Sequence, residues 1–127
     1  MNLNGLRAPR EAFTLVEIMI VVAIIGLLAA LALPSFLKSR KQSQGRRIVN
    51  DARQMDAAVD QWALETSQTD GSPINTVAVS TYLKIAWKTS DLLGNRYRVS
   101  TIGTNQITIS NRTKRALTGV GIDWGHY

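Results

Sequence analysis

The stretch that decides the fold is residues 13–33, FTLVEIMIVVAIIGLLAALAL. Glu17 is its only charged residue, and Thr14 is its only other polar one. As an α-helix, this stretch would be about 30 Å long, which matches the hydrocarbon thickness of a bilayer. A helix that is apolar on every side needs lipid or protein around it. Residues 13–33 therefore predict a membrane-spanning helix.

Glu17 is the exception within this apolar stretch. A carboxylate inside a membrane span costs about 2.5–3.5 kcal/mol unless it is paired or protonated. The nearest basic residues, Arg7 and Arg10, lie outside the span. The cost of placing this carboxylate in a membrane predicts that Glu17 has a partner. The alternative is that Glu17 has no partner and the span tolerates it.

Length and charge limit what the rest of the chain can be. The chain has 127 residues, so the part beyond residue 33 is long enough for one small domain with a modest core. Its net charge of +6 fits binding to nucleic acid, binding to an anionic membrane surface, or simple solubility. Solubility is the favoured interpretation because aromatic residues are not interleaved with the basic ones.

Residues 1–12, MNLNGLRAPREA, have the character of a targeting leader, with Arg7 and Arg10 before the apolar stretch. Two cleavage sites compete. A secretory signal peptide would be cut after residues 30–32, ALA, which match the small-residue rule. Alternatively, the cut falls before the apolar stretch, and the helix stays on the mature protein. Glu17 favours the second site, because an acid is not expected in the apolar region of a signal peptide.

Residues 10–17, REAFTLVE, followed by a long apolar run and Pro34, resemble the prepilin signature of type IV pilins and of the pseudopilins of type II secretion. The resemblance implies cleavage between Ala12 and Phe13 by a prepilin peptidase, and N-methylation of Phe13. It also implies a role for Glu17 and Pro34 in assembly. The family nearly always has glycine before the cut, and this chain has Ala12, the closest small residue.

Physical chemistry is consistent with these implied roles. Cleavage would create an α-ammonium on Phe13, which Glu17 of a neighbouring chain could reach in a stack of helices. A buried pair of this kind fixes register more than it adds stability. Pro34 has no backbone N–H and would clash with the carbonyl of Ala30, so we expect a bend or a locally opened turn there.

A basic cluster follows the apolar stretch. Residues 35–50 contain five cations and no acid: Lys38, Arg40, Lys41, Arg46 and Arg47. If Arg7 and Arg10 are cytoplasmic, this cluster lies on the far side of the membrane, against the usual charge bias. It could contact lipid head groups or DNA, but a solvated helix face is the favoured interpretation.

The second half of the helix is predicted to be amphipathic. Its apolar residues recur at spacings of four and three and line one face, as a packed helix requires: Ile48, Ala52, Met55, Val59 and Trp62. Asp51, Arg53, Asp56 and Asp60 lie off this stripe. Residues 69–73, TDGSP, are strong turn formers, so the helix is predicted to run from Phe13 to about Ser67.

The remaining sequence predicts a small β-structure. In residues 97–102 and 106–110, successive side chains would alternate between the two faces of a strand, and these segments flank Gly103-Thr104-Asn105. This predicts a hairpin with Ile107 and Ile109 facing inward. Thr76 is a candidate cap for a short helix carrying Val77 and Leu83. Residues 91–95 are expected to form a loop, and residues 111–127 to be irregular or one more edge strand.

A calcium site is the one cofactor to consider. Residues 91–97, DLLGNRY, resemble a loop of major pseudopilins, and that resemblance implies calcium near the C-terminal loop. Asp91 and Asp123 are the only acids after Asp70, which is few for a cation that takes 6–8 oxygen ligands. We therefore predict no cofactor and no metal site, with calcium as the weaker alternative.

Nothing in the sequence indicates an enzyme. The chain has no cysteine and one histidine, His126, and it contains no nucleophile elbow, phosphate loop or metal-ligand spacing. We predict no catalytic residues.

Together these patterns predict an α+β protein in which a long N-terminal α-helix packs on a small antiparallel β-sheet. The expected regions are a leader (1–12), a transmembrane or filament-core helix (13–34) and a soluble pilin-like domain (35–127). The resemblance implies a filament subunit, of a pilus or of a secretion pseudopilus, that starts as a single-pass inner-membrane protein and ends in a periplasmic or cell-surface filament.

Its expected partners are prepilin peptidase, copies of itself and other pilins, an inner-membrane assembly platform and membrane lipid. Nucleic acid is a partner that the sequence leaves unsupported. Two alternatives remain open: a secreted binding domain whose signal is cut after Ala32, and a single-pass membrane protein that never polymerises.

Overall fold

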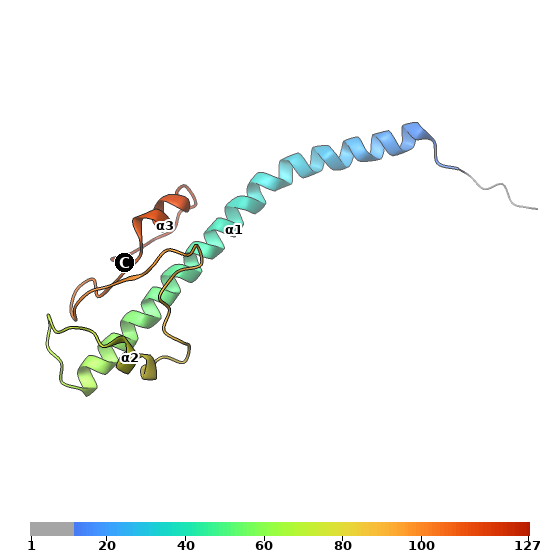
Figure 1. Ribbon diagram of the computed structural model, residues 1–127. Coiled ribbons are helices and arrows are strands. Elements are labelled where there is room, and N and C mark those ends of the chain that lie inside the picture. Colours follow the sequence, from blue (N-terminus) through green and yellow to red (C-terminus); the bar gives the residue numbers. More distant parts are fainter. Residues whose placement is uncertain (1–11) are drawn as a thin grey trace, which may run out of the picture. The chain divides into compact units, whose positions relative to one another are not determined.

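The computed structural model describes residues 12–127 and is dominated by one helix (Figure 1). This helix, α1, runs from Leu15 to Glu65, within two residues of the predicted start and end. Pro34 lies inside it, and the helix continues through this position. Arg7, Arg10 and the rest of the predicted leader up to residue 11 lie outside the described residues.

The chain divides into two compact units, Met1–Phe36 and Leu37–Tyr127. In the first unit, the described part is the N-terminal portion of α1, and every residue from 12 to 36 is exposed. Its apolar side chains have no protein around them, which is the situation that the sequence of residues 13–33 predicts.

The second unit has a core built on one face of α1. The predicted stripe is confirmed, since Ile48, Ala52 and Val59 are fully buried and Met55 and Trp62 nearly so. The stripe contributes to two core clusters. The first joins α1 to Tyr97, Ile107, Ile109, Leu117 and Tyr127, and the second joins it to Val79 and Ile102. Trp62 belongs to the second cluster, so it is a core residue, as expected.

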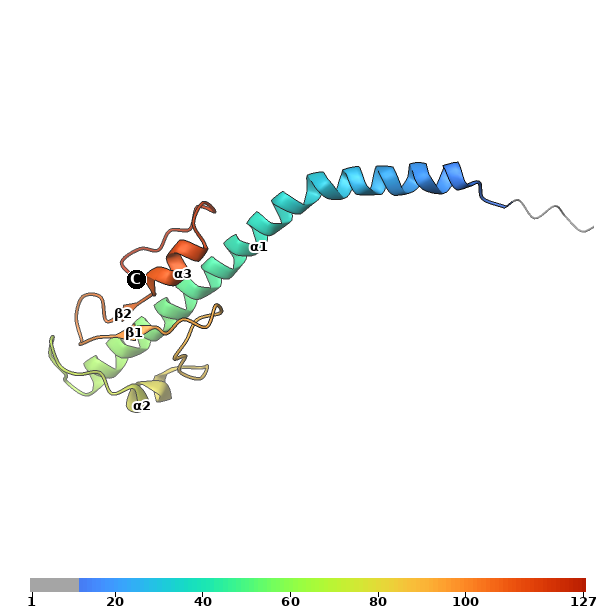
Figure 2. The same ribbon diagram turned by 45° about the horizontal axis from the view of Figure 1, so that its top comes forward.

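The predicted hairpin is confirmed, with shorter strands than expected. Strand β1 (Arg98–Val99) pairs antiparallel with β2 (Ile107–Thr108), with Val99 opposite Ile107 (Figure 2). Gly103, with φ +123°, lies in the turn, a conformation that glycine adopts without strain. Ile107 and Ile109 are buried as expected. The expected alternation fails in the first strand, where Val99 is exposed.

That failure has a local cause. A second segment of the chain pairs with the end of the first strand: Gly71 donates its N–H to the carbonyl of Ile102 (2.8 Å), and Ile102 donates to Ser72 (3.0 Å). In a regular strand, Ile102 would lie on the same face as Arg98, yet Ile102 is buried in the second core cluster and Arg98 is exposed. The face that points to the core therefore changes between Tyr97 and Ile102, because the regular strand is too short to keep the alternation.

Two short helices differ from the expectations. Helix α2 runs from Thr76 to Val79, but Asn75, not Thr76, caps it, and Val79 is the buried residue whereas Val77 is exposed. A 3₁₀ turn, Ser80–Tyr82, follows. The prediction of an irregular tail or edge strand from residue 111 is wrong at its start, because α3 spans Asn111–Ala116. Ser110 caps α3 by accepting a hydrogen bond from the N–H of Arg112 (3.3 Å).

Candidate assembly site on the N-terminal helix

The first turn of α1 is closed by Thr14 and Glu17. Thr14 donates its backbone N–H (2.9 Å) and its hydroxyl (3.1 Å) to Glu17 Oε2, and the N–H of Glu17 donates to the Thr14 hydroxyl (3.2 Å). This reciprocal arrangement is a capping box, with the acid at the third helical position. It satisfies backbone N–H groups that a helix start otherwise leaves without partners.

The capping box changes the interpretation of Glu17. The predicted need for a partner is met in part within the chain, by neutral donors rather than by a cation. A negative charge at a helix N-terminus is also favoured by the helix dipole. The signal was present in the sequence as Thr14-x-x-Glu17 before an apolar run, and the sequence reasoning did not use it.

The predicted cleavage site is accessible. Ala12 is exposed, and the Phe13 side chain is 82 % exposed. Both residues precede the helix, which starts at Leu15. The backbone nitrogen of Phe13 is one residue from that of Thr14, so it lies within about 7 Å of Glu17 Oε2. An α-ammonium at Phe13 would therefore lie close to the Glu17 carboxylate of its own chain.

The apolar helix surface is available for lipid or for other helices. Within residues 12–127, α1 is the one helix long and apolar enough to cross a membrane by length and composition, and its apolar part is unburied. A secretory signal near an N-terminus has the same properties, so exposure alone does not separate the two. A Cβ added at Gly26 would meet nothing within 4 Å beyond its chain neighbours and the helix's own backbone, so this position on the helix surface is open.

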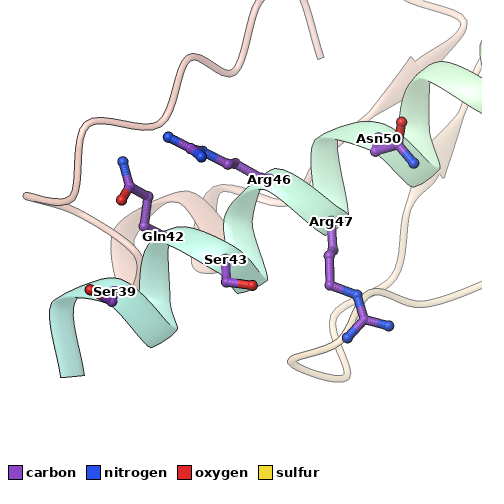
Figure 3. A pocket seen from close by; sticks show the side chains of 6 residues that line it. All are labelled: Ser39, Gln42, Ser43, Arg46, Arg47 and Asn50. Carbon is purple, nitrogen blue, oxygen red and sulfur yellow. The ribbon is translucent and has the colours of Figure 1, made fainter. Parts of the chain in front are cut away.

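The basic cluster lies on α1 in the second unit. All five cations, from Lys38 to Arg47, are exposed. Figure 3 shows an open hollow along the helix in which Arg46 points to the same side as Gln42, whereas Arg47 points away from them. Polar side chains line this hollow: Ser39, Gln42, Ser43, Arg46, Arg47 and Asn50.

The residues of the possible calcium loop do not fit a cation. The Asp91 carboxylate accepts hydrogen bonds from the N–H groups of Leu93 (2.8 Å) and Asn95 (2.9 Å), and from the buried hydroxyl of Thr113. Asp123 Oδ1 accepts from the N–H of Gly125 (2.9 Å). The described residues contain no cluster of three or more His, Cys, Asp or Glu side chains able to hold a metal. Protein donors occupy the place that a cation would need.

The apolar spacing of the sequence does not predict two buried polar residues, Asp51 and Gln106. Asp51 lies off the apolar stripe, yet it is buried and pairs with Lys88 (2.6 Å). Gln106 is buried in the hairpin and donates to Asp60 (2.5 Å). Burial raises the pKa of Tyr97, and the negative charges of Asp51 and Asp91 raise it further. The contacts of Asp51 and Gln106 join α1 to the later segments.

Comparison with known proteins identifies the N-terminal signature. The model of the prokaryotic N-terminal methylation motif matches residues 7–33. The chain is 34 % identical over 103 residues to the type IV major fimbrial protein FimA of Dichelobacter nodosus, an alignment that covers 81 % of this chain and 59 % of that protein. It is also 32 % identical over 59 residues to the type II secretion system core protein G of Klebsiella pneumoniae, covering 46 % and 42 % of the two chains.

A third relative is fimbrial protein Q of Moraxella bovis, 47 % identical over 51 residues that cover 40 % of this chain and 32 % of that protein. The chain spans about half the length of the first of these relatives, 49–59 % for the FimA proteins. No solved structure matches the chain.

The chain resembles pilin-like proteins in its methylation motif, and it has the predicted α+β fold of a long N-terminal helix and a small antiparallel sheet. Within that class, the predicted resemblance to the superfamily of type IV pilins and type II secretion pseudopilins is confirmed by the motif and by the relatives.

Proposed function

We propose that the chain is a structural subunit of an extracytoplasmic filament, cleaved between Ala12 and Phe13 and polymerised through its N-terminal helix. The observation that carries this proposal is the start of α1. An acid held in a capping box is followed by an apolar helix surface without protein around it. The methylation motif at residues 7–33 and the pilin relatives support the same function.

The proposed processing is by a prepilin peptidase, followed by N-methylation of Phe13. The exposed Ala12 and Phe13, which precede the helix, are accessible to such an enzyme. A cleavage site inside a helix would have to unwind before it could enter a peptidase. The proposed cut precedes Leu15, where α1 starts, so α1 stays intact. Ala12 takes the place of the usual glycine.

Glu17 has two proposed roles. In the membrane-inserted subunit it closes the capping box and remains near the head groups, where its charge costs little. In a filament, lipid is replaced by neighbouring helices, and an uncompensated charge there is expensive. The Phe13 ammonium of a neighbouring chain then pairs with Glu17, in competition with the ammonium of its own chain. Pro34 remains a proposed assembly residue, as the point where helical hydrogen bonding loses one donor.

The proposed location follows from the helix. Residues 13–33 hold the subunit in the inner membrane as a single span, and the subunit later joins a periplasmic or cell-surface filament. Its partners are prepilin peptidase, other copies or other pilins, and an inner-membrane assembly platform that supplies the energy for leaving lipid. The chain performs no catalysis in this proposal.

Expression with a prepilin peptidase and measurement of the N-terminal mass test the processing step. The expected product starts at methylated Phe13. A product that starts at Leu33 would contradict the proposal and favour a secreted domain, which the fold permits because the core lies entirely within Leu37–Tyr127. A product that starts at Phe13 but stays monomeric in the membrane would favour a single-pass protein that never polymerises.

A further inference from the structure

We propose that Lys38, Arg40 and Lys41 bind the phosphate groups of anionic phospholipids at the membrane surface where the apolar helix ends. The proposal rests on the membrane-inserted state described under the proposed function. It assigns a partner to three exposed cations that the filament account does not use.

These cations are free to bind. All three are exposed on α1. Among residues 12–127, the acidic side chains within ion-pair distance of a basic one are Asp51, which contacts Lys88, and Asp56, which contacts His126, so none of the three cations pairs with an acid of that range. The sequence from 35 to 50 contains no acid at all. Their positive charge is therefore available to an anion from outside the chain.

Their position along the helix matches the phosphate layer. At about 1.5 Å per residue, Lys38 comes about 7.5 Å after Leu33 along α1, and Lys41 about 12 Å after it. Head groups extend roughly 5–8 Å beyond the hydrocarbon on each side of a bilayer. Long basic side chains reach back to such a layer. Arg46 and Arg47 follow about 20 Å after Leu33 and are outside the proposed site.

Lipid fits these cations better than the other anionic partners do. Phe36 is the only aromatic residue among residues 35–50, so the sequence around the cluster has no series of aromatic residues on which bases could stack. A second copy in the same register would set its own positive cluster against this one and repel it. An anionic bilayer surface attracts each nearby lysine or arginine, by roughly fivefold in partitioning per charge at physiological ionic strength.

The test measures which lipid the full chain retains. The chain is reconstituted into mixed phosphatidylcholine and phosphatidylglycerol bilayers, released in mild detergent, and analysed by native mass spectrometry for bound lipid. The variant K38Q/R40Q/K41Q removes the site, and glutamine is a good helix former, so α1 is preserved. The control R98Q/R112Q/R115Q removes the same amount of charge from exposed positions elsewhere in the second unit.

The expected result is several-fold enrichment of phosphatidylglycerol on the wild type and on the control. The enrichment should disappear in K38Q/R40Q/K41Q and in about 1 M salt, where the Debye length falls to about 3 Å. Equal enrichment on all three proteins would overturn the proposal. So would a wild type without lipid preference that binds a DNA duplex through the same three residues.

Membrane extraction of the same samples separates the two proposals. A wild type that inserts but shows no preference for phosphatidylglycerol overturns the lipid site alone and leaves the filament function standing. A wild type that is absent from the membrane overturns both.

Discussion

Replacing Thr113 with valine removes one hydroxyl from the centre of the C-terminal region while keeping the shape of the side chain. Thr113 is fully buried, donates to the Asp91 carboxylate and accepts a hydrogen bond from the side-chain amide of Asn95 (3.0 Å). Valine leaves both of these groups without that partner. Each unsatisfied buried polar group costs about 1–3 kcal/mol. We expect the free energy of unfolding to fall by about 2–4 kcal/mol, the lower part of the sum, because Asn95 is only half-buried.

Thr113→Ser is the matched control. It keeps the hydroxyl and loses one buried methyl group, which costs about 1 kcal/mol. The assay is urea unfolding of a chain that begins at Ser39, which retains both core clusters. If the valine variant is as stable as the wild type, or more stable than the serine variant, the hydroxyl does not hold the Asp91 loop, and the account of this region is wrong.

The remaining predictions use the same shortened chain. It should be a folded monomer, and Trp62→Ala should destabilise it by about 3–5 kcal/mol, whereas unchanged thermal stability would show that the stripe is not core. Gly45→Ala should destabilise it by up to about 2 kcal/mol, since the new Cβ would overlap the side chain of Ile122 and overpacking outweighs the gain in helix propensity. Ile122→Ala should abolish this effect in a double-mutant cycle, and an unchanged cost would refute the contact. The raised pKa of buried Tyr97 means that the native state keeps its proton after the unfolded state has lost it, so stability should fall above about pH 10, and Tyr97→Phe should flatten that fall in unfolding curves measured against pH. Calcium or a chelator should leave the urea midpoint unchanged, and a rise with calcium would contradict the assignment of Asp91 to protein donors.

The long helix and its buried stripe were predictable because their signals are periodic and strong. The apolar run from residue 13 and the spacing from Ile48 to Trp62 both extend over several turns, so no tertiary contact overrides them. The hairpin was predictable from its turn, where Gly103 and Asn105 adopt positive φ. Local signals of this kind act within a few residues.

The errors come from contacts that join distant segments or from caps. Helix α3 was missed because its start depends on Ser110 as a cap and on Thr113 reaching Asp91, 22 residues earlier. The burial of Asp51 depends on Lys88, 37 residues later, and helical periodicity places Asp51 on the polar side. At the candidate site, the roles of Phe13 and Glu17 came from the family resemblance. The Thr14 partner was readable from the sequence but was not used.

The assembly of Glu17 variants tests the central claim most directly. Glutamine at position 17 keeps a capping-box partner for Thr14 and removes the charge, whereas valine removes both. The measurement is the yield of filaments relative to the processed subunit in the membrane, whose N-terminal mass is determined in the same cells. The account predicts normal insertion and a mature start at Phe13 for both variants, with filament assembly lost or strongly reduced in both. Wild-type filament yield from Glu17→Val would contradict the account, because it would leave Glu17 without a role in assembly.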